Sequence, residues 1–332
     1  MIDKQFKIKL ICIYYGMLPE WFPLWLKSCS KNPNYDFLLI TDQKYENTYA
    51  KNVEIKNLSW EELKHKFENV LEMPISLEKP YKLCDFRPIF GMAFADELKE
   101  YDFWGHCDLD MIWGDLSEFI TEEDLSVYDR IGLYGAFTIY RNTDENRKLY
   151  KKYGASFSYK RVFSNSESYL FDEMPGMNCI CVKNNIKWKT KIKIADIDTY
   201  LMRYGSDLLV THETFSWESG VAKHYYLENN VVISDRVAYI HFSGKKPRLK
   251  TKQLEQVVFD HNSIIELNKA IENPEDLIQY SGFISAEDDS NQRKYNKKIR
   301  SIKIFKSTLT QKMVRLVNQL YIRRFYKYIQ KS

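Results

Sequence analysis

The chain has 332 residues, of which 44% are hydrophobic and 15% are aromatic, and its formal net charge is +4. A chain of this length and composition can bury a sizeable core, which excludes an intrinsically disordered protein. No apolar run in the sequence approaches the ~18 residues that a membrane-spanning helix needs.

Basic and acidic residues are distributed unevenly. Residues 291–332 contain 13 Lys or Arg and no Asp or Glu, which leaves 36 basic against 45 acidic residues, a net charge of −9, for residues 1–290. The asymmetry predicts an anionic partner for the tail. The acidic body argues against an extended nucleic-acid surface, so we expect no nucleic-acid partner.

Two observations favour a cytoplasmic protein. The six cysteines lie mostly in apolar segments and show no zinc-site spacing, so we expect reduced core thiols. The apolar run that ends at Gly16 is too short for the apolar core of a signal peptide, and we expect it to form the first strand.

Apolar runs alternate with helix-like segments along the chain. The candidate elements, in order, are a strand at 6–14, a helix from about Pro19 to Cys29, strands at 37–40 and 53–55, a helix opened by the capping box Ser59-Trp60-Glu61-Glu62, a helix from Pro88 to Lys99, a strand ending before Asp108, a helix start at Thr121 and a strand from Arg130 to Tyr140. Such alternation predicts an α/β fold with a mostly parallel sheet covered by helices on both faces. Ligands in such folds bind beyond the carboxyl ends of the strands, where Tyr14, Asp108 and His241 would meet.

The most informative motif is Asp108-Leu109-Asp110, which directly follows the strand-like run Tyr101–Trp104. Paired carboxylates at a strand end suit Mg²⁺ or Mn²⁺, which leave coordination positions for substrate phosphates. Two turn aspartates remain an alternative. A second pair, Asp196 and Asp198, is the main rival for a metal.

A second motif lies far downstream, in His241-Phe242-Ser243-Gly244-Lys245-Lys246-Pro247. An imidazole can complete a divalent metal site and favours Mn²⁺ over Mg²⁺. Lys245 and Lys246 supply positive charge for a diphosphate, and Gly244 lets the backbone approach a ligand. A histidine satisfied within a core or turn is the alternative for His241.

Together these motifs resemble those of GT-A-fold glycosyltransferases, particularly the bacterial lipopolysaccharide galactosyltransferase and glycogenin group. The segment Lys82–Arg87, followed by Gly91, is similar to the segment that precedes Asp-x-Asp in mannosyltransferase-type relatives. The run Ser76–Phe86 resembles uncharacterised bacterial proteins of capsule and surface-polysaccharide synthesis. The resemblance covers roughly residues 6–250, and it departs from the pattern at Arg248, where a Trp often follows the Lys-Pro.

The resemblance implies a GT-A-type, Rossmann-like catalytic domain in residues 1–250. After it we expect a helical extension at 251–280, a linker at 281–292 and a basic amphipathic helical tail at 293–332.

The resemblance also implies roles for individual residues. Asp110 and His241 would ligate the metal, and Asp108 would bind the metal or the ribose. Lys245 or Lys246 would hold the diphosphate, while Tyr14 or Tyr15 would stack on the nucleobase. The alternative for both tyrosines is a position in the core.

Two further pairs carry weaker signals. Asp85 and Arg87 would bind donor hydroxyls and phosphate, although they could instead form a structural ion pair. Asp172 and Glu173 loosely resemble the Asp-Gln-Asp segment that contacts the transferred sugar, with Glu173 in place of Gln. Acidic residues at a helix start are the alternative for that pair.

These observations predict a glycosyltransferase that uses Mn²⁺ or Mg²⁺ and moves a sugar from a nucleotide sugar to a glycan or lipid-linked glycan. The expected product is a bacterial surface glycan of capsule or lipopolysaccharide type, formed with retention of anomeric configuration if the galactosyltransferase resemblance extends to mechanism. Alternatives are a nucleotidyl- or phosphate-transferring enzyme with the same metal site, a glycoside hydrolase that uses carboxylates alone, and a non-enzymatic protein that binds anionic surfaces.

The tail combines basic residues with an apolar stripe. The stripe recurs at intervals of three or four residues, as on one face of a helix, and consists of Ile302, Phe305, Leu309, Met313, Leu316 and Leu320. This composition is typical of an in-plane anchor on an anionic membrane, which would hold the protein peripherally at the inner face of the bacterial plasma membrane. A helix packed on the catalytic domain is the alternative. We expect residues 1–289 to turn over donor without the tail.

Overall fold

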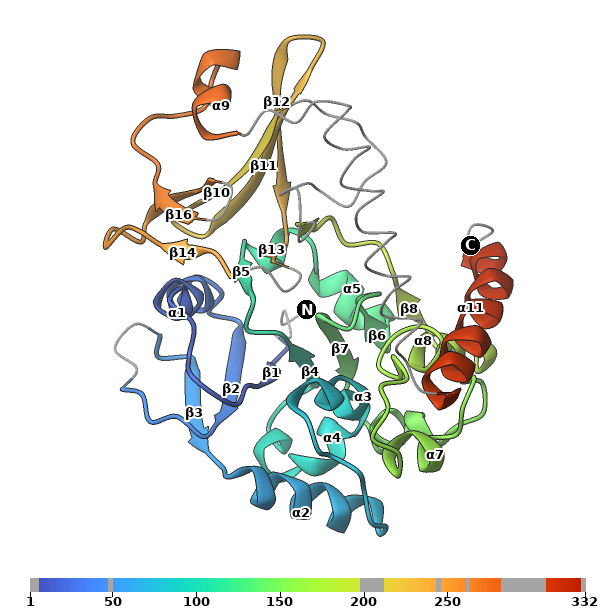
Figure 1. The fold of residues 1–332 in the computed structure, drawn as a ribbon. Coiled ribbons are helices and arrows are strands. Elements are labelled where there is room, and N and C mark those ends of the chain that lie inside the picture. The colour runs from blue at the N-terminus through green and yellow to red at the C-terminus, as the bar shows by residue number, and fades with distance from the viewer. Residues whose placement is uncertain are drawn as a thin grey trace.

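The computed structural model describes residues 6–46, 50–197, 212–242, 246–260, 263–281 and 309–329, with the side chains of 309 and 311–320 in the last segment. These residues form an α/β structure with three sheets, in which most of the helices lie around the first sheet (Figure 1). Asp198, Lys245, most of the expected linker and the tail residues Ile302 and Phe305 lie outside the described residues.

Seven strands form the first sheet, in the order β3-β2-β1-β4-β7-β6-β8. Their bounds are β1 Ile8–Ile13, β2 Tyr35–Thr41, β3 Val53–Asn57, β4 Phe103–Cys107, β6 Arg130–Ile131, β7 Phe137–Arg141 and β8 Trp188–Lys189. From β3 to β4 the neighbouring strands are parallel, whereas β7 runs antiparallel to both β4 and β6. The strands from β3 to β4 have the parallel order that we expected, and β8 is parallel to β6, but the two antiparallel pairings of β7 make the sheet as a whole mixed.

The mixed order arises from a hairpin. We expected one strand from Arg130 to Tyr140, but this span folds back on itself to form β6 and β7. Gly132 has a φ of +105°, and a Cβ there would lie 2.5 Å from the carbonyl oxygen of Phe137. A short connection of this kind joins antiparallel strands, so β7 returns beside β4 in the opposite direction.

Helices cover both faces of this sheet. The helices are α1 Phe22–Ser30, α2 Trp60–Leu71, α3 Leu83–Phe86, α4 Phe90–Ala93, α5 Glu122–Val127, α6 Asp144–Arg147, α7 Tyr159–Phe163 and α8 Met177–Lys183, with 3₁₀ turns η1 Pro80–Lys82, η2 Arg87–Ile89, η3 Asp96–Leu98, η4 Leu116–Glu118 and η5 Leu149–Lys151. The side chains of β1 alternate between two cores, with Leu10 in the cluster of Trp25 from α1 and Ile11 in the cluster of Phe67 from α2. The capping box that begins at Ser59 is confirmed. The helix expected from Pro88 to Lys99 is instead divided among η2, α4 and η3.

A second sheet lies beyond the first, in the order β12-β11-β10-β15-β16-β14. Its strands are β10 Glu213–Glu218, β11 Val221–Glu228, β12 Val231–Val237, β14 Arg248–Leu249, β15 Gln256–Asp260 and β16 Ser263–Glu266, and α9 Pro274–Tyr280 packs on it. The expectation of a helical extension at 251–280 is therefore wrong, because this segment adds two strands to the sheet and only α9 is helical. Its short, β-branched apolar runs, Val257-Val258 and Ile264-Ile265, suit a strand.

A small third sheet joins the two larger units. It consists of β5 Met111–Trp113, β13 Tyr239–His241 and β9 Ala195–Asp196, with β13 in the centre. Asp108 and Asp110 directly precede β5, and His241 is the last residue of β13.

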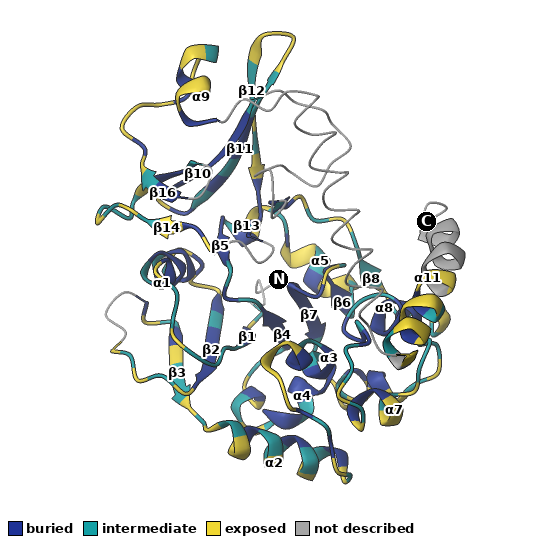
Figure 2. Ribbon diagram, in the orientation of Figure 1, coloured by how far each residue is buried: buried dark blue, intermediate teal, exposed yellow. Residues whose placement is uncertain are grey.

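The tail forms helix α11, Leu309–Ile329. Among the side chains of this helix that the structure describes, the buried ones are Val314, which joins the core cluster of Tyr169, and Asn318. The predicted apolar stripe instead faces outward, and its described members are 85%, 44%, 58% and 59% exposed at Leu309, Met313, Leu316 and Leu320 (Figure 2). None of the described helices is long and apolar enough to cross a membrane.

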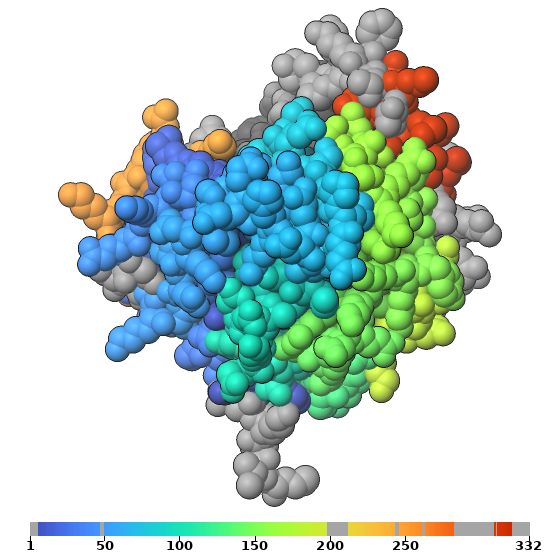
Figure 3. Space-filling model, turned by 90° about the horizontal axis from the view of Figure 1, so that it is seen from below, coloured from blue at the N-terminus to red at the C-terminus, as the bar shows by residue number. Residues whose placement is uncertain are grey.

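The position of α11 bears on the expectation for the tail. Seen from below, the helix lies against the segment that holds α7 (Figure 3). Because Val314 and Asn318 are buried against the body, the described part of the tail packs on it, which is the alternative that the sequence left open.

Candidate metal centre and its cavity

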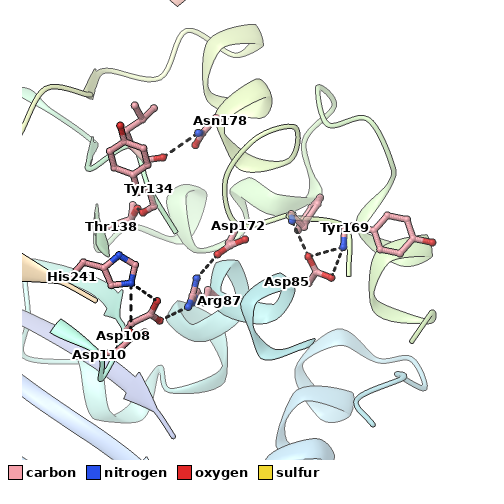
Figure 4. A network of polar contacts seen from close by, with 12 residues as sticks. Asp85, Arg87, Asp108, Asp110, Tyr134, Thr138, Tyr169, Asp172, Asn178 and His241 are labelled. Carbon is pink, nitrogen blue, oxygen red and sulfur yellow. Dashed lines mark hydrogen bonds and ion pairs between the residues drawn. The ribbon is translucent and has the colours of Figure 1, made fainter. Parts of the chain in front are cut away.

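The third sheet brings together residues that are far apart in the sequence. His241 pairs with Met111 of β5 and with Asp196 of β9, and the N–H of Phe242 donates to the carbonyl of Asp110 at 2.8 Å. As a result, single ligand atoms of Asp108, Asp110 and His241 all lie within 4.8 Å of one another. Figure 4 shows the imidazole facing the carboxylates. These are the three residues that the sequence predicts as metal ligands.

The two nitrogens of His241 face different carboxylates. Nε2 lies 3.5 Å from Oδ1 of Asp110 and 4.0 Å from Oδ2 of Asp108, whereas Nδ1 lies 2.8 Å from Oδ1 of Asp196. Burial disfavours the charged imidazole, but the hydrogen bonds with Asp110 and Asp196 and the charges of Asp110 and Asp108 outweigh it and raise the pKa to about 10. When Nδ1 donates to Asp196, Nε2 carries the lone pair that would ligate a metal between Asp110 and Asp108.

This donor set fits a divalent cation. Two carboxylates and one imidazole leave several positions for water and phosphate oxygens, as Mn²⁺ and Mg²⁺ require. Asp196 belongs to the second Asp-x-Asp motif, so the sequence predicts it as a rival metal ligand. In the structure it lies behind His241, on the nitrogen that faces away from Asp108 and Asp110.

The cluster opens into a cavity of about 580 Å³. Its walls carry most of the other predicted site residues, namely Tyr14, Arg87, Asp172, Glu173 and Lys246. A smaller pocket of about 220 Å³ adjoins it and is lined by both Tyr14 and Tyr15. The two pockets share Arg87 and Asp108, so together they form one continuous site.

Arg87 links the two acidic sides of the cavity. It forms an ion pair with Asp108 on one side and with Oδ2 of Asp172, at 2.5 Å, on the other (Figure 4). Burial raises the pKa of Asp108, and the guanidinium of Arg87 partly offsets that shift. A Cβ on Gly135 would lie 2.3 Å from Oδ2 of Asp172 and 2.8 Å from Nη1 of Arg87. A larger residue at position 135 would therefore have to displace this ion pair.

Asp172 and Glu173 form the opposite wall of the cavity. Asp172 is buried, and burial raises the pKa of both carboxyl groups. The turn that carries them is fixed at its end, because the N–H of Asn178 in α8 donates to the carbonyl of Glu173 at 3.1 Å. The expected acidic pair is thus placed in the site, across Arg87 from the metal cluster.

Asp85 does not reach the cavity, so its predicted contact with donor hydroxyls is wrong. It is fully buried and accepts hydrogen bonds from Nζ of Lys82 at 2.9 Å, from the N–H of Tyr169 at 2.9 Å and from the N–H of Phe171 at 2.8 Å. Because the short helix α3 turns this carboxylate away from the cavity, Asp85 anchors the loop before Asp172, and only Arg87 of the pair faces the site.

Tyr14 and Tyr15 follow β1 at the edge of the smaller pocket. The hydroxyl of Tyr14 donates to the carbonyl of Met17 at 3.3 Å, and that of Tyr15 donates to the carbonyl of Ser59 at 3.2 Å. The ring of Tyr15 also meets Trp60 edge-on, with 5.0 Å between the centroids. Both tyrosines are partly exposed, so each has ring surface available to a ligand.

The family model that matches this chain is described as a family of unknown function (DUF6625), and it covers residues 10–273. The chain belongs to this family. Its matched region holds every residue of the candidate site, whereas α11 follows it. No curated protein matches the chain.

Several residues of the site had no signal in the sequence. The sequence predicts Asp196 only as a rival metal ligand, and no motif singles out Gly135 or Tyr134. Tyr134 and Tyr81 both line the cavity and are 47% and 67% exposed. Exposed aromatic residues at a cavity are a structural signal that spacing alone does not provide.

Proposed function

We propose that the protein is a metal-dependent glycosyltransferase that uses a nucleotide sugar as donor. The observation that carries the proposal is the cluster of Asp108, Asp110 and His241, which opens into a cavity large enough for a nucleotide sugar. A divalent cation held there, Mn²⁺ or Mg²⁺, would neutralise the charge that develops on the leaving diphosphate.

Different residues of the cavity would bind different parts of the donor and its cation. Asp110 and the Nε2 atom of His241 bind the cation, and Asp108 binds the cation or the ribose. Lys246 lines the same cavity and supplies positive charge for the diphosphate, with Lys245 as its neighbour in the chain.

The remaining wall serves the transferred sugar. Arg87 reaches both sides of the cavity and can donate to a phosphate oxygen or a sugar hydroxyl. Asp172 and Glu173 face the same space and would orient the sugar through its hydroxyl groups. The ring faces of Tyr14 and Tyr15 would hold the nucleobase in the smaller pocket. We propose retention of anomeric configuration, which needs no enzymic base of the usual kind.

The acceptor that we propose is a glycan or lipid-linked glycan of a bacterial surface polysaccharide, built at the cytoplasmic face of the membrane. Helix α11 supports a peripheral membrane location, because its outward face carries Leu309, Met313, Leu316 and Leu320. Lys312 and Arg315 are exposed beside them. Each basic residue near an anionic leaflet contributes roughly 1 kcal/mol to binding, so the intact chain should pellet with anionic vesicles at low salt and be released as salt rises.

The proposal is tested by binding of a panel of nucleotide sugars in the presence of Mn²⁺, measured by calorimetry. We expect one class of nucleotide sugar to bind, with Mn²⁺ required. Asp110→Ala should abolish the binding, whereas Asp96→Ala, which removes a carboxylate that is 83% exposed on the surface, should leave it unchanged. Binding that is equal with and without Mn²⁺, or equal in Asp110→Ala, would remove the metal site from the proposal.

A further inference from the structure

The loop that carries Asp172 and Glu173 is held from two sides. On its inner side, Asp85 accepts the N–H groups of Tyr169 and Phe171, as described above. On its outer side, Nδ2 of Asn318 in α11 donates to the carbonyl of Tyr169 at 3.2 Å. Helix α11 therefore supplies a hydrogen bond to the loop that leads into the cavity wall at Asp172 and Glu173.

Asn318 is well placed for this contact. Its side chain is 6% exposed, and its Oδ1 accepts the hydroxyl of Ser156 at 3.4 Å while Nδ2 reaches Tyr169. Both ends of the buried carboxamide are thus paired, as a buried polar group requires. Val314, one turn earlier on the same face, joins the core cluster that contains Tyr169 and Phe171.

The contact lies close to the site in the chain. Leu170, directly after Tyr169, lines the cavity and has a φ of +55°, an uncommon backbone conformation for a residue with a branched side chain. Asp172 follows two residues later and pairs with Arg87. A shift of the Tyr169 peptide would therefore move both the cavity wall and the carboxylate that Arg87 holds.

We propose that Asn318 is a positioning residue, through which the docked C-terminal helix sets the place of Asp172 and Glu173. This inference goes beyond the proposed function, because it concerns the link between α11 and the site and does not depend on which reaction occurs there. The opposite face of α11 carries the exposed apolar residues, so the same helix connects the surface proposed for membrane contact with the cavity wall.

The test compares Asn318→Ala with Gln319→Ala, its exposed neighbour on the same helix, in the full chain. Hydrogen exchange followed by mass spectrometry should show residues 169–173 exchanging roughly fivefold faster in Asn318→Ala, the factor that corresponds to a hydrogen bond of typical strength. Strand β1 should exchange at the wild-type rate in both variants. Donor turnover should fall severalfold in Asn318→Ala while the affinity for Mn²⁺ is unchanged, because the metal ligands lie on other elements.

Three results would overturn the proposal. These are unchanged exchange in residues 169–173, an equal rise in exchange throughout the chain, and wild-type turnover despite faster exchange in the loop. If Asn318→Ala does not yield folded protein, Ser156→Ala releases the other end of the carboxamide and should raise exchange in the same loop by a smaller factor. The exchange measurement needs no substrate, so its failure is distinguishable from failure of the proposed function.

Discussion

The role of Asp196 gives the sharpest prediction about the metal centre. Its Oδ1 lies 2.8 Å from Nδ1 of His241, whereas Nε2 faces Asp110 and Asp108 at 3.5 and 4.0 Å. A carboxylate that orients a ligating imidazole in this way typically accounts for about 10–100-fold in metal affinity. We therefore expect Asp196→Ala to weaken Mn²⁺ binding by about that factor, equivalent to roughly 1.4–2.7 kcal/mol.

The matched variant is Asp196→Asn, which removes the same charge but keeps an oxygen that can accept the Nδ1–H of His241. If orientation is the main contribution, Asn should retain most of the affinity that Ala loses. The assay is a titration with Mn²⁺ followed by electron paramagnetic resonance, which detects the free ion directly. Equal loss in both variants would show that charge alone matters. A loss beyond about 1,000-fold, well outside the usual range for an orienting group, would make Asp196 a direct ligand. Wild-type affinity in both would refute the assignment of His241 as an oriented ligand.

Three further predictions concern packing, pH and the tail. Gly135→Ala should lower the free energy of unfolding by about 1–3 kcal/mol in chemical denaturation, because its Cβ would overlap Asp172 and Arg87; unchanged stability would contradict the close approach. In metal-free protein, His241 has a folded-state pKa of about 10, above its usual 6.5, so its charged form stabilises the fold fully below pH 6.5 and this contribution is lost as pH rises towards 10. The difference in unfolding free energy between wild type and His241→Gln should shrink over that window, and a constant difference would be inconsistent with it. Leu316→Ser combined with Leu320→Ser should reduce pelleting with anionic vesicles by about tenfold or more, because each change removes an apolar side chain that would be buried in the membrane. The control is Val231→Ser, at a site 57% exposed in the second sheet, which should leave pelleting unchanged.

The metal cluster could be anticipated from the sequence because Asp108 follows one apolar strand and His241 ends another. Ligand-binding residues lie at the ends of strands, so the two were expected to meet despite their separation in the chain. In the structure they meet because β13 pairs with β5 in the third sheet and not with β4. The neighbouring strand β9 had no comparable signal, because it is two residues long and its pairing with β13 is a long-range contact. The sequence therefore did not separate the orienting role of Asp196 from that of a ligand.

Other expectations failed for local reasons. Asp85 and Arg87 are two residues apart on short helical turns, so they point in different directions, one into the core and one into the cavity. Short apolar runs such as Val257–Phe259 fit a strand or a buried helix equally well by periodicity, and only their pairing with β10 decides. Four of the six residues of the predicted stripe, Leu309, Met313, Leu316 and Leu320, are described and exposed, but the sequence did not indicate that Val314 and Asn318 form the face that packs on the body.

The most direct test of the central claim is product analysis after incubation of the protein with the nucleotide sugar that binds, in the presence of Mn²⁺. We expect slow release of free sugar and nucleoside diphosphate, abolished by EDTA and by Asp110→Ala, with the sugar released first in the anomeric configuration of the donor. Release of nucleoside monophosphate or pyrophosphate would instead indicate nucleotidyl or phosphate transfer at the same metal site. Sugar release that persists in EDTA and in Asp110→Ala would contradict metal-dependent glycosyl transfer.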